Sequence, residues 1–129
     1  MKIEHIALWA QDIEEMRKFY VKYFELTQND KYSNQSKEFC SYFLRFKSGA
    51  RLEIMQMSNV EISNRDPLGN FVGLAHFAIS VGSKEKVDSL TSVLRADGYK
   101  VLDGPRTTGD GYYESSVLDP EDNRIEITI

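Results

Sequence analysis

Residues 73–81, Gly-Leu-Ala-His-Phe-Ala-Ile-Ser-Val, repeat after a long gap the pattern of residues 3–8, Ile-Glu-His-Ile-Ala-Leu. The histidines in these two segments are the only histidines of the protein. A second matched pair of segments follows after about fifty residues in each case, at 51–54 (Arg-Leu-Glu-Ile) and at 124–127 (Arg-Ile-Glu-Ile). The chain is therefore interpreted as two copies of one His…Glu module.

The length of the chain limits how this duplication can fold. With 129 residues the chain has room for one ordinary domain, so two half-size modules have to share one core. We expect a first module at about residues 1–57, a linker at about 58–72 and a second module at about 73–129. The linker contains Asn, Asp, Ser, Pro and Gly without a clear period.

Charge and cysteine content narrow the class of protein. The formal net charge of −4 argues against binding to a phosphate backbone, so no nucleic-acid partner is expected. The lone Cys40 cannot form an intrachain disulfide, which is typical of a reducing compartment. The first residues are charged where a signal peptide needs an apolar run, and no segment approaches membrane-spanning length. We therefore expect a cytoplasmic protein with no membrane partner.

Hydrophobic periodicity predicts the same element order in both modules. In the first module Asp12, followed by Glu15, is typical of a helix N-cap, and in the second module Ser83 and Gly98 bound the helix. For the first module we predict a strand at 2–9, a helix at 12–24, a short strand at 28–32, a loop at 33–36 and a hairpin of strands 39–46 and 51–57. For the second module we predict a strand at 73–81, a helix, a short strand at 99–102, a turn-rich loop at 103–111 and strands at 112–118 and 124–129. Each module thus reads βαβββ, an α+β pattern.

Strand alternation places the histidines and glutamates on matching faces. His5 shares a face with Trp9, and Glu53 shares one with Met55. His76 occupies the same place in its strand as His5. Each predicted helix covers the opposite face, so the sequence predicts that imidazole and carboxylate groups from four strands come together.

Such a mixed nitrogen and oxygen site suits one divalent ion such as nickel, zinc, cobalt, manganese or iron. The predicted ligands are His5, Glu53, His76 and Glu126. Four protein ligands on an octahedral ion leave two positions for neighbouring oxygens of a substrate, where the ion acts as a Lewis acid on a developing enediolate. This chemistry suits proton abstraction next to a carbonyl.

Each ligand also has a purely structural interpretation. A single histidine on a strand is more often a packed residue than a ligand, and a single glutamate is often a surface residue. Arg51 and Arg124 stand two residues before Glu53 and Glu126 and could form ion pairs with them instead. The metal hypothesis rests on the four residues together, because unpaired carboxylates on apolar faces are costly.

The paired modules, the His and Glu positions and residues 119–126 (Asp-Pro-Glu-Asp-Asn-Arg-Ile-Glu) resemble the vicinal oxygen chelate superfamily. This superfamily comprises glyoxalases, bleomycin-resistance proteins and extradiol dioxygenases. The resemblance covers essentially the whole chain and implies an open, cup-shaped, eight-stranded mixed sheet with helices outside, a small-molecule substrate and a homodimer. The His, Glu, His, Glu set is similar to glyoxalase I (lactoylglutathione lyase), which implies a lyase or isomerase with Glu126 as the catalytic base and Glu53 as its near-symmetric partner.

The resemblance breaks where glutathione-using glyoxalases carry an arginine, four residues after the first histidine, because Trp9 stands there. A different thiol adduct, or a smaller aromatic substrate resting on Trp9 and Met55, is an alternative to the glutathione adduct. Other members of the superfamily remain open, namely an epimerase, a thiol transferase or an extradiol dioxygenase. A non-catalytic binding or resistance protein is also open, with an aromatic wall of Trp9, Phe43, Tyr112 and Tyr113.

Overall fold

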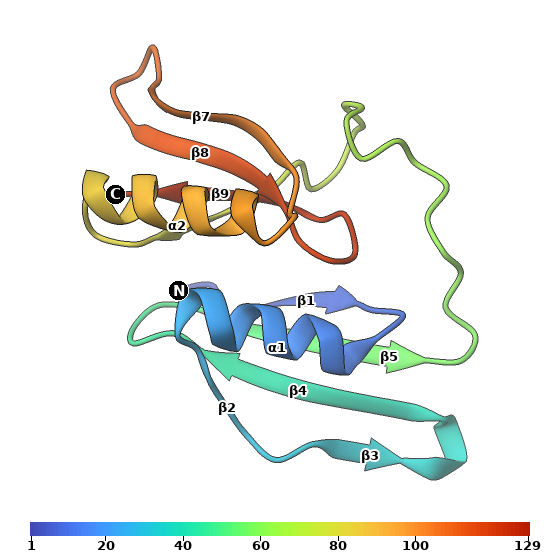
Figure 1. The fold of residues 1–129 in the computed structure, drawn as a ribbon. Helices are drawn as coiled ribbons and strands as arrows, with labels where there is room; N and C mark the ends of the chain where they lie inside the picture. The colour runs from blue at the N-terminus through green and yellow to red at the C-terminus, as the bar shows by residue number, and fades with distance from the viewer. The chain divides into compact units, whose positions relative to one another are not determined.

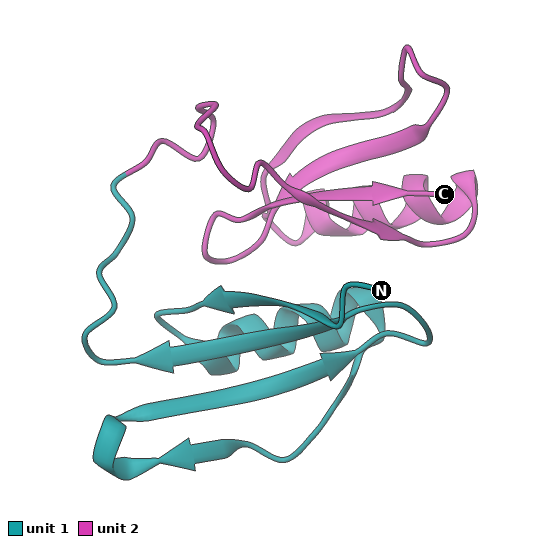
Figure 2. Cartoon of the chain, turned by 180° about the vertical axis from the view of Figure 1, so that it is seen from behind, with its two compact units in different colours: residues 1–64 teal, residues 65–129 magenta.

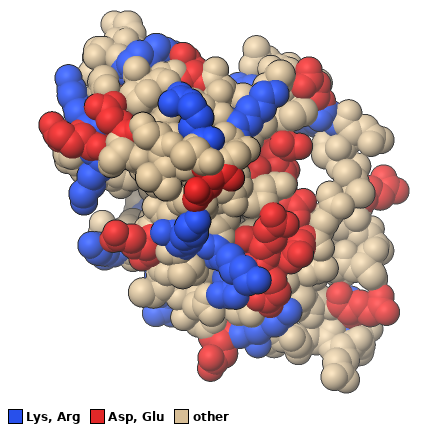
Figure 3. All heavy atoms as spheres, viewed as in Figure 1, with Lys and Arg blue, Asp and Glu red and all other residues tan.

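The computed structural model describes residues 1–129 as two compact units, Met1–Asn64 and Arg65–Ile129 (Figure 2). Each unit contains one α-helix packed on one sheet, and each is described by itself. No helix combines the length and the apolar character that a membrane span requires. On the face drawn in Figure 3, lysines and arginines alternate with acidic side chains, and no continuous basic stripe is visible there.

The first unit has strand order β1-β5-β4-β2, with β3 pairing to β4 as well (Figure 1). β1 runs parallel to β5, whereas β4 and β5 form an antiparallel hairpin. The elements are β1 (His5–Trp9), α1 (Ile13–Phe24), β2 (Thr27–Gln28), β3 (Tyr32–Asn34), a 3-10 helix (Gln35–Lys37), β4 (Phe39–Arg45) and β5 (Arg51–Met57).

Helix α1 begins and packs as its sequence predicts. The Asp12 side chain accepts hydrogen bonds from the backbone N–H groups of Glu14 and Glu15, at 3.0 and 2.9 Å, and so caps the first turn. The apolar side of the helix is buried together with one face of the sheet. The buried side chains of this core include Ile13, Met16, Phe19, Tyr20, Leu44, Leu52 and Ile54. The opposite sheet face, which carries His5, is left clear of α1.

The region between α1 and β4 differs from the prediction. The expected strand at 28–32 and loop at 33–36 are wrong, because two short strands, β2 and β3, flank a bend. Asn29 lies in this bend, and its side-chain oxygen accepts the Phe43 N–H at 2.7 Å. The Asn29 side-chain oxygen accepts the hydrogen bond that a backbone carbonyl would accept in regular strand pairing. The pairing with β4 is therefore interrupted at this point.

The second unit has strand order β6-β9-β8-β7. β6 runs parallel to β9, and the other neighbours are antiparallel, as in the first unit. The elements are β6 (Phe77–Ser80), α2 (Lys84–Ala96), β7 (Val101–Thr107), β8 (Tyr113–Leu118) and β9 (Arg124–Thr128). β6 is shorter than the predicted strand at 73–81, so His76 lies immediately before it.

Strand β7 is longer than the sequence predicts. The loop expected from residue 103 begins only after Thr107, and the strand passes through a cis Gly104–Pro105 bond with two register shifts against β8. β7 is the edge strand of its sheet, where a proline without an N–H is tolerated. The glycine and proline therefore mark an irregular edge strand rather than a turn.

Helix α2 is capped as predicted, with the Ser83 hydroxyl accepting the Lys86 N–H at 3.3 Å. It buries Val87, Thr91 and Leu94 against the sheet, and the Thr91 hydroxyl lies 2.6 Å from that of Ser115 on β8. The predicted α+β class with two βαβββ modules is confirmed, with nine strands because the second strand of the first module is divided into β2 and β3.

Candidate functional site

In the first unit, parallel pairing of β1 with β5 brings His5 and Glu53 together. The register sets Ala7 opposite Glu53, so the glutamate lies diagonally across from His5 on the same face. His5 Nε2 is 3.8 Å from a Glu53 carboxylate oxygen, and the Glu53 side chain is 15% exposed. This carboxylate therefore faces an imidazole in a half-buried setting.

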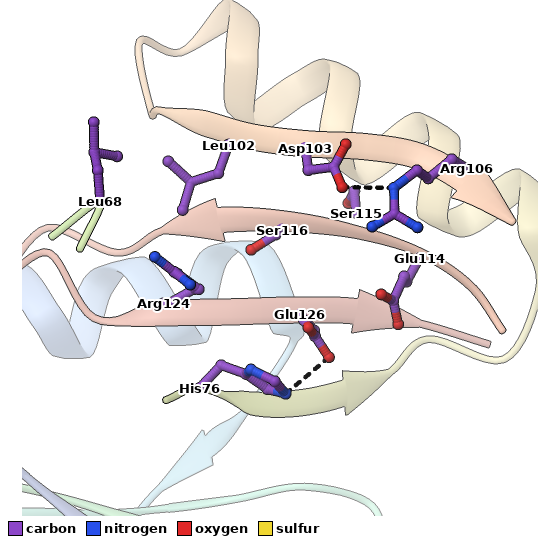
Figure 4. A pocket seen from close by; sticks show the side chains of 10 residues that line it. All are labelled: Leu68, His76, Leu102, Asp103, Arg106, Glu114, Ser115, Ser116, Arg124 and Glu126. Carbon is purple, nitrogen blue, oxygen red and sulfur yellow. Dashed lines mark hydrogen bonds and ion pairs between the residues drawn. The ribbon is translucent and has the colours of Figure 1, made fainter. Parts of the chain in front are cut away.

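The second unit repeats this arrangement between β6 and β9. Ala78 lies opposite Glu126, and His76 Nε2 is 3.0 Å from a Glu126 carboxylate oxygen (Figure 4). The Glu126 side chain is 21% exposed. In both units the residue opposite the glutamate is an alanine two positions after the histidine, so the two His–Glu pairs are equivalent in register and in chemistry.

The two arginines that precede the glutamates contact other groups. Arg51 donates to Glu4 across 2.6 Å, and Arg124 donates to the Pro67 backbone carbonyl at 3.2 Å. The ion pairs with Glu53 and Glu126 that the sequence left open are not among the contacts that these arginines make. Each glutamate thus has a histidine, and not its neighbouring arginine, as its close partner.

Glu4 joins the first pair, although the sequence did not single it out. One of its oxygens lies 2.5 Å from His5 Nδ1, and the other accepts from Arg51. The hydrogen bonds from Arg51 and then His5 lower the pKa of the Glu4 carboxyl to about 2. The available signal was the carboxylate directly before His5, where the second module has Ala75.

A cavity of about 380 Å³ opens beside the second pair (Figure 4). Its walls combine two glutamates, one aspartate, two arginines, one histidine, two serines and two leucines. They are formed by Leu68, His76, Leu102, Asp103, Arg106, Glu114, Ser115, Ser116, Arg124 and Glu126. Within it, Arg106 donates to Asp103 at 2.5 Å. The His76–Glu126 pair is therefore accessible to a small molecule.

Glu114 is a residue of this cavity that the sequence reading missed. Burial raises the pKa of its carboxyl, and the nearby charge of Glu126 adds to this effect. The signal was present in strand alternation, because β8 sets Ser116 opposite Glu126 and Glu114 lies two residues earlier on the same face.

Three of the predicted substrate-binding residues lie on the His5 face of the first unit. Phe43 meets the His5 ring edge to face, with centroids 5.5 Å apart. Trp9, 43% exposed, packs edge to face on Phe39, and Met55 is its backbone partner on β5. Their role in binding substrate stays a prediction.

The two predicted tyrosines are placed differently. The Tyr113 hydroxyl donates to Asp88 on α2 at 2.6 Å, so this side chain lies on the helix-covered face. The β8 residue that lines the cavity is its neighbour Glu114, and the role of Tyr113 in binding substrate stays a prediction. Tyr112 is exposed in the loop before β8, and its role stays a prediction.

The donor separation in each pair can be compared with that of two ligands of one divalent ion. Bonds of about 2.1 Å to nitrogen and oxygen at right angles set two ligands of one ion about 3 Å apart. The His76–Glu126 separation of 3.0 Å matches this distance, whereas the His5–Glu53 separation of 3.8 Å is longer. No group of three or more His, Cys, Asp or Glu side chains that could hold a metal ion is present, and each unit offers one His–Glu pair.

Residues 2–127 match the family model described as the Glyoxalase/Bleomycin resistance protein/Dioxygenase superfamily. The chain belongs to this superfamily. The resemblance inferred from the sequence is thus confirmed over nearly the whole chain. The chain is also similar to the uncharacterized protein YqjT of Bacillus subtilis (strain 168). The two are 27% identical over 134 residues, which cover 97% of this chain and 96% of YqjT.

Solved structures similar to this one bear the same family names. The trypanothione-dependent glyoxalase I of Leishmania major matches with a TM-score of 0.78 at 20% identity, over 99% of this chain and 86% of its own. A protein of Bacillus cereus described as a possible glyoxalase matches with a TM-score of 0.72 at 26% identity, over 100% and 99% of the two chains. At such low identity, the Leishmania structure shows that this superfamily member shares the fold of glyoxalase I.

Proposed function

We propose that the chain is a divalent-metal-dependent lyase or isomerase of glyoxalase I type. Its ligands would be His5, Glu53, His76 and Glu126. The observation that carries the proposal is the matched register of the two His–Glu pairs, each diagonal across a parallel strand pair. A packed histidine or a surface glutamate does not require this equivalence in two modules.

A bound ion would supply Lewis acidity to two neighbouring oxygens of the substrate. The proton movement falls to the carboxylates of this chain. Glu126 opens to the cavity, and one of its oxygens is held near His76. In the proposed reaction this carboxylate takes the proton from the carbon next to the carbonyl and returns it to the neighbouring carbon.

Glu53 is the near-symmetric partner of Glu126 in this proposal. Trp9 stands where glutathione-using glyoxalases carry an arginine. The proposed substrates are therefore hemithioacetals of small thiols and related aromatic carbonyl adducts. Their apolar part would rest on Trp9, Phe43 and Met55, which share the His5 face. Tyr112 and Tyr113 are the remaining proposed contacts.

Elemental analysis after incubation with nickel or zinc tests the metal site. We expect stoichiometric metal in the parent and its loss in Glu53→Gln and Glu126→Gln. Glu61→Gln is the matched control, because Glu61 is an exposed carboxylate that lines no part of the site, and its loss changes the net charge equally. A parent protein without stoichiometric metal would sink the proposal.

An activity assay then separates the two glutamates. The parent is given hemithioacetals of several low-molecular-weight thiols, and formation of the thioester is followed. Loss of the base lowers kcat by about 10²-fold or more, and we expect the larger loss in Glu126→Gln. Equal and full activity in both variants would contradict the assignment of a carboxylate base.

A second candidate is a non-catalytic binding or resistance protein. It is favoured by the exposed Trp9 and its edge-to-face contact with Phe39, which form an aromatic surface beside His5. The test compares Glu53→Gln and His76→Ala with the parent in binding a planar aromatic compound. Equally tight binding by all three without metal would favour this candidate over the enzyme.

The proposal also includes a homodimer that works in the cytoplasm. The homodimer is what the superfamily resemblance implies, and the cytoplasm is expected from the single cysteine. Sedimentation of the purified protein tests the dimer, and cell fractionation tests the compartment. A monomer at all concentrations would contradict the first of these two expectations.

A further inference from the structure

The two modules hold their equivalent histidines in different ways. Before His5 stands Glu4, with an oxygen 2.5 Å from the ring nitrogen Nδ1. Before His76 stands Ala75, which has no carboxylate to offer. The arginines differ accordingly, since Arg51 contacts Glu4 whereas its counterpart in the second module contacts a backbone carbonyl. The first histidine therefore has a second carboxylate partner that the duplication does not explain.

The strand pairing fixes this contact. β1 and β5 set His5 opposite Arg51, and the Arg51 backbone N–H donates to the Glu4 carbonyl at 2.9 Å. Glu4 and Arg51 are thus held side by side at the start of the sheet, and their side chains meet across 2.6 Å. The Arg51 guanidinium also lies 4.1 Å from the centre of the Phe43 ring, which in turn contacts His5 edge to face.

The chemistry of the contact decides which ring nitrogen carries the proton. The Glu4 carboxylate lies between the Arg51 guanidinium, at 2.6 Å, and His5 Nδ1, at 2.5 Å, and an ionised carboxylate only accepts hydrogen bonds. Nδ1 of His5 therefore carries the N–H, and in the neutral ring Nε2 keeps its lone pair. Nε2 is the nitrogen that faces Glu53.

We infer that Glu4 is a positioning residue that selects the Nδ1–H tautomer of His5 and presents its Nε2 as a metal ligand. The inference rests on the proposed metal-dependent function and goes beyond it by assigning a role to Glu4 and to Arg51 behind it. A carboxylate on the outer nitrogen of a ligating histidine raises ligand basicity and fixes the ring, and its loss typically lowers metal affinity 10–100-fold.

A merely structural role for Glu4 gives a different expectation. The Glu4 side chain is 57% exposed, and exposed ion pairs contribute little to folding stability. Removing the carboxylate should therefore leave the melting temperature nearly unchanged. A loss of metal affinity without loss of stability is the signature that separates positioning from structure.

The experiment compares the full-length parent with Glu4→Gln, Glu4→Ala and the control Glu61→Ala. Nickel or zinc affinity is measured by competition with a chromophoric chelator. Nitrogen-15 chemical shifts of metal-free protein at one mildly alkaline pH report the tautomer, and because the chain has only two histidines a His76→Gln spectrum assigns both. Thermal melting of each variant is recorded in parallel.

We expect the Nδ1–H form of His5 in the parent, and mostly the Nε2–H form in Glu4→Ala. Metal affinity should fall 10–100-fold in Glu4→Ala, less in Glu4→Gln, which keeps an acceptor oxygen, and within about twofold in Glu61→Ala. Arg51→Met should lower affinity by a smaller factor, because Glu4 remains but is no longer held.

The outcomes distinguish the inference from the function on which it rests. A parent that binds no metal overturns the proposed function and with it the inference. A parent that binds metal while Glu4→Ala binds equally tightly overturns the inference alone, whatever the tautomer. Weaker binding by Glu4→Ala with an unchanged tautomer also refutes the mechanism inferred for Glu4.

Discussion

Replacement of Asp119 should destabilise the turn that leads into β9, the strand that carries Glu126. Asp119 is 3% exposed, and its carboxylate accepts the backbone N–H groups of Glu121 and Asn123 at 2.9 and 2.8 Å. The Asn123 side-chain amide donates to it as well, at 2.9 Å. This turn joins β8 to β9 and sets the register that places Ser116 opposite Glu126.

The magnitude follows from the donors left behind. Asp119→Ala removes the acceptor for two backbone N–H groups and one amide, and hydrogen bonds to a charged group contribute about 1.5–3 kcal/mol each without adding fully. Water reaches part of the emptied turn, so we expect a loss of about 3 kcal/mol in the free energy of unfolding, or about 10 °C in melting temperature. Asp119→Asn keeps one acceptor oxygen and should lose about half as much.

Urea and thermal unfolding of the parent and three variants measure this effect. The control is Asp122→Asn in the same turn, because Asp122 has a φ of 62° and asparagine tolerates this left-handed conformation. The control should stay within about 0.5 kcal/mol of the parent. If Asp119→Ala costs no more than the control, the carboxylate does not hold the turn and the reasoning is refuted.

Three further predictions concern contacts outside the proposed ligand set. Burial raises the pKa of the Glu14 carboxyl, but its hydrogen-bond donors outweigh this effect and lower the pKa from 4.5 to about 2. The ionised carboxylate therefore stabilises the fold above pH 4.5, and this stabilisation is lost as the pH falls from 4.5 toward 2. In urea titrations, Glu14→Gln should reduce the change in the free energy of unfolding over that interval by about 1 kcal/mol, allowing for solvent screening. Thr91→Val should lower the free energy of unfolding by about 1–2 kcal/mol, because it leaves the buried Ser115 hydroxyl without its hydrogen-bond partner. The double variant with Ser115→Ala should lose less than the sum of the two single changes. Arg124→Met should release the Pro67 carbonyl and speed hydrogen exchange of the Leu68 amide about fivefold, whereas an unchanged rate would show that this contact does not hold the loop.

Local pattern predicts the regular elements because each leaves a signal in neighbouring residues. The cap at Asp12, the cap at Ser83 and the alternation of β5 are all readable over a few positions, and the structure follows them. The placement of Glu53 and Glu126 on the histidine faces follows from the same alternation. Sequence therefore suffices where backbone period and side-chain chemistry agree.

The misses occur where a single side chain overrides the period. Asn29 bonds to the Phe43 backbone and divides one expected strand in two, which no count of apolar positions reveals. Pro105 reads as a turn, yet at a sheet edge it remains within β7.

Glu4 escapes a sequence reading for another reason. Neighbouring residues of a strand point to opposite faces, so alternation places Glu4 away from His5. β1, however, begins at His5, so Glu4 precedes the strand and its side chain need not follow the alternation. Arg51 from the adjacent strand β5 holds the Glu4 side chain in place. A contact between sequence neighbours is thus created by a residue 47 positions away from Glu4 along the chain.

The duplication itself explains why the two His–Glu pairs are so similar while their surroundings differ. A parallel strand pair with an alanine opposite the glutamate leaves the diagonal toward the histidine open, because the methyl groups of Ala7 and Ala78 are too short to fill it. That geometry is common to both units and needs no other residue. The remaining contacts are then free to diverge, so one histidine acquires a carboxylate at Nδ1 while the other borders the cavity that contains Glu114. A repeated core can in this way place equivalent His–Glu pairs in both halves while the contacts around each pair differ.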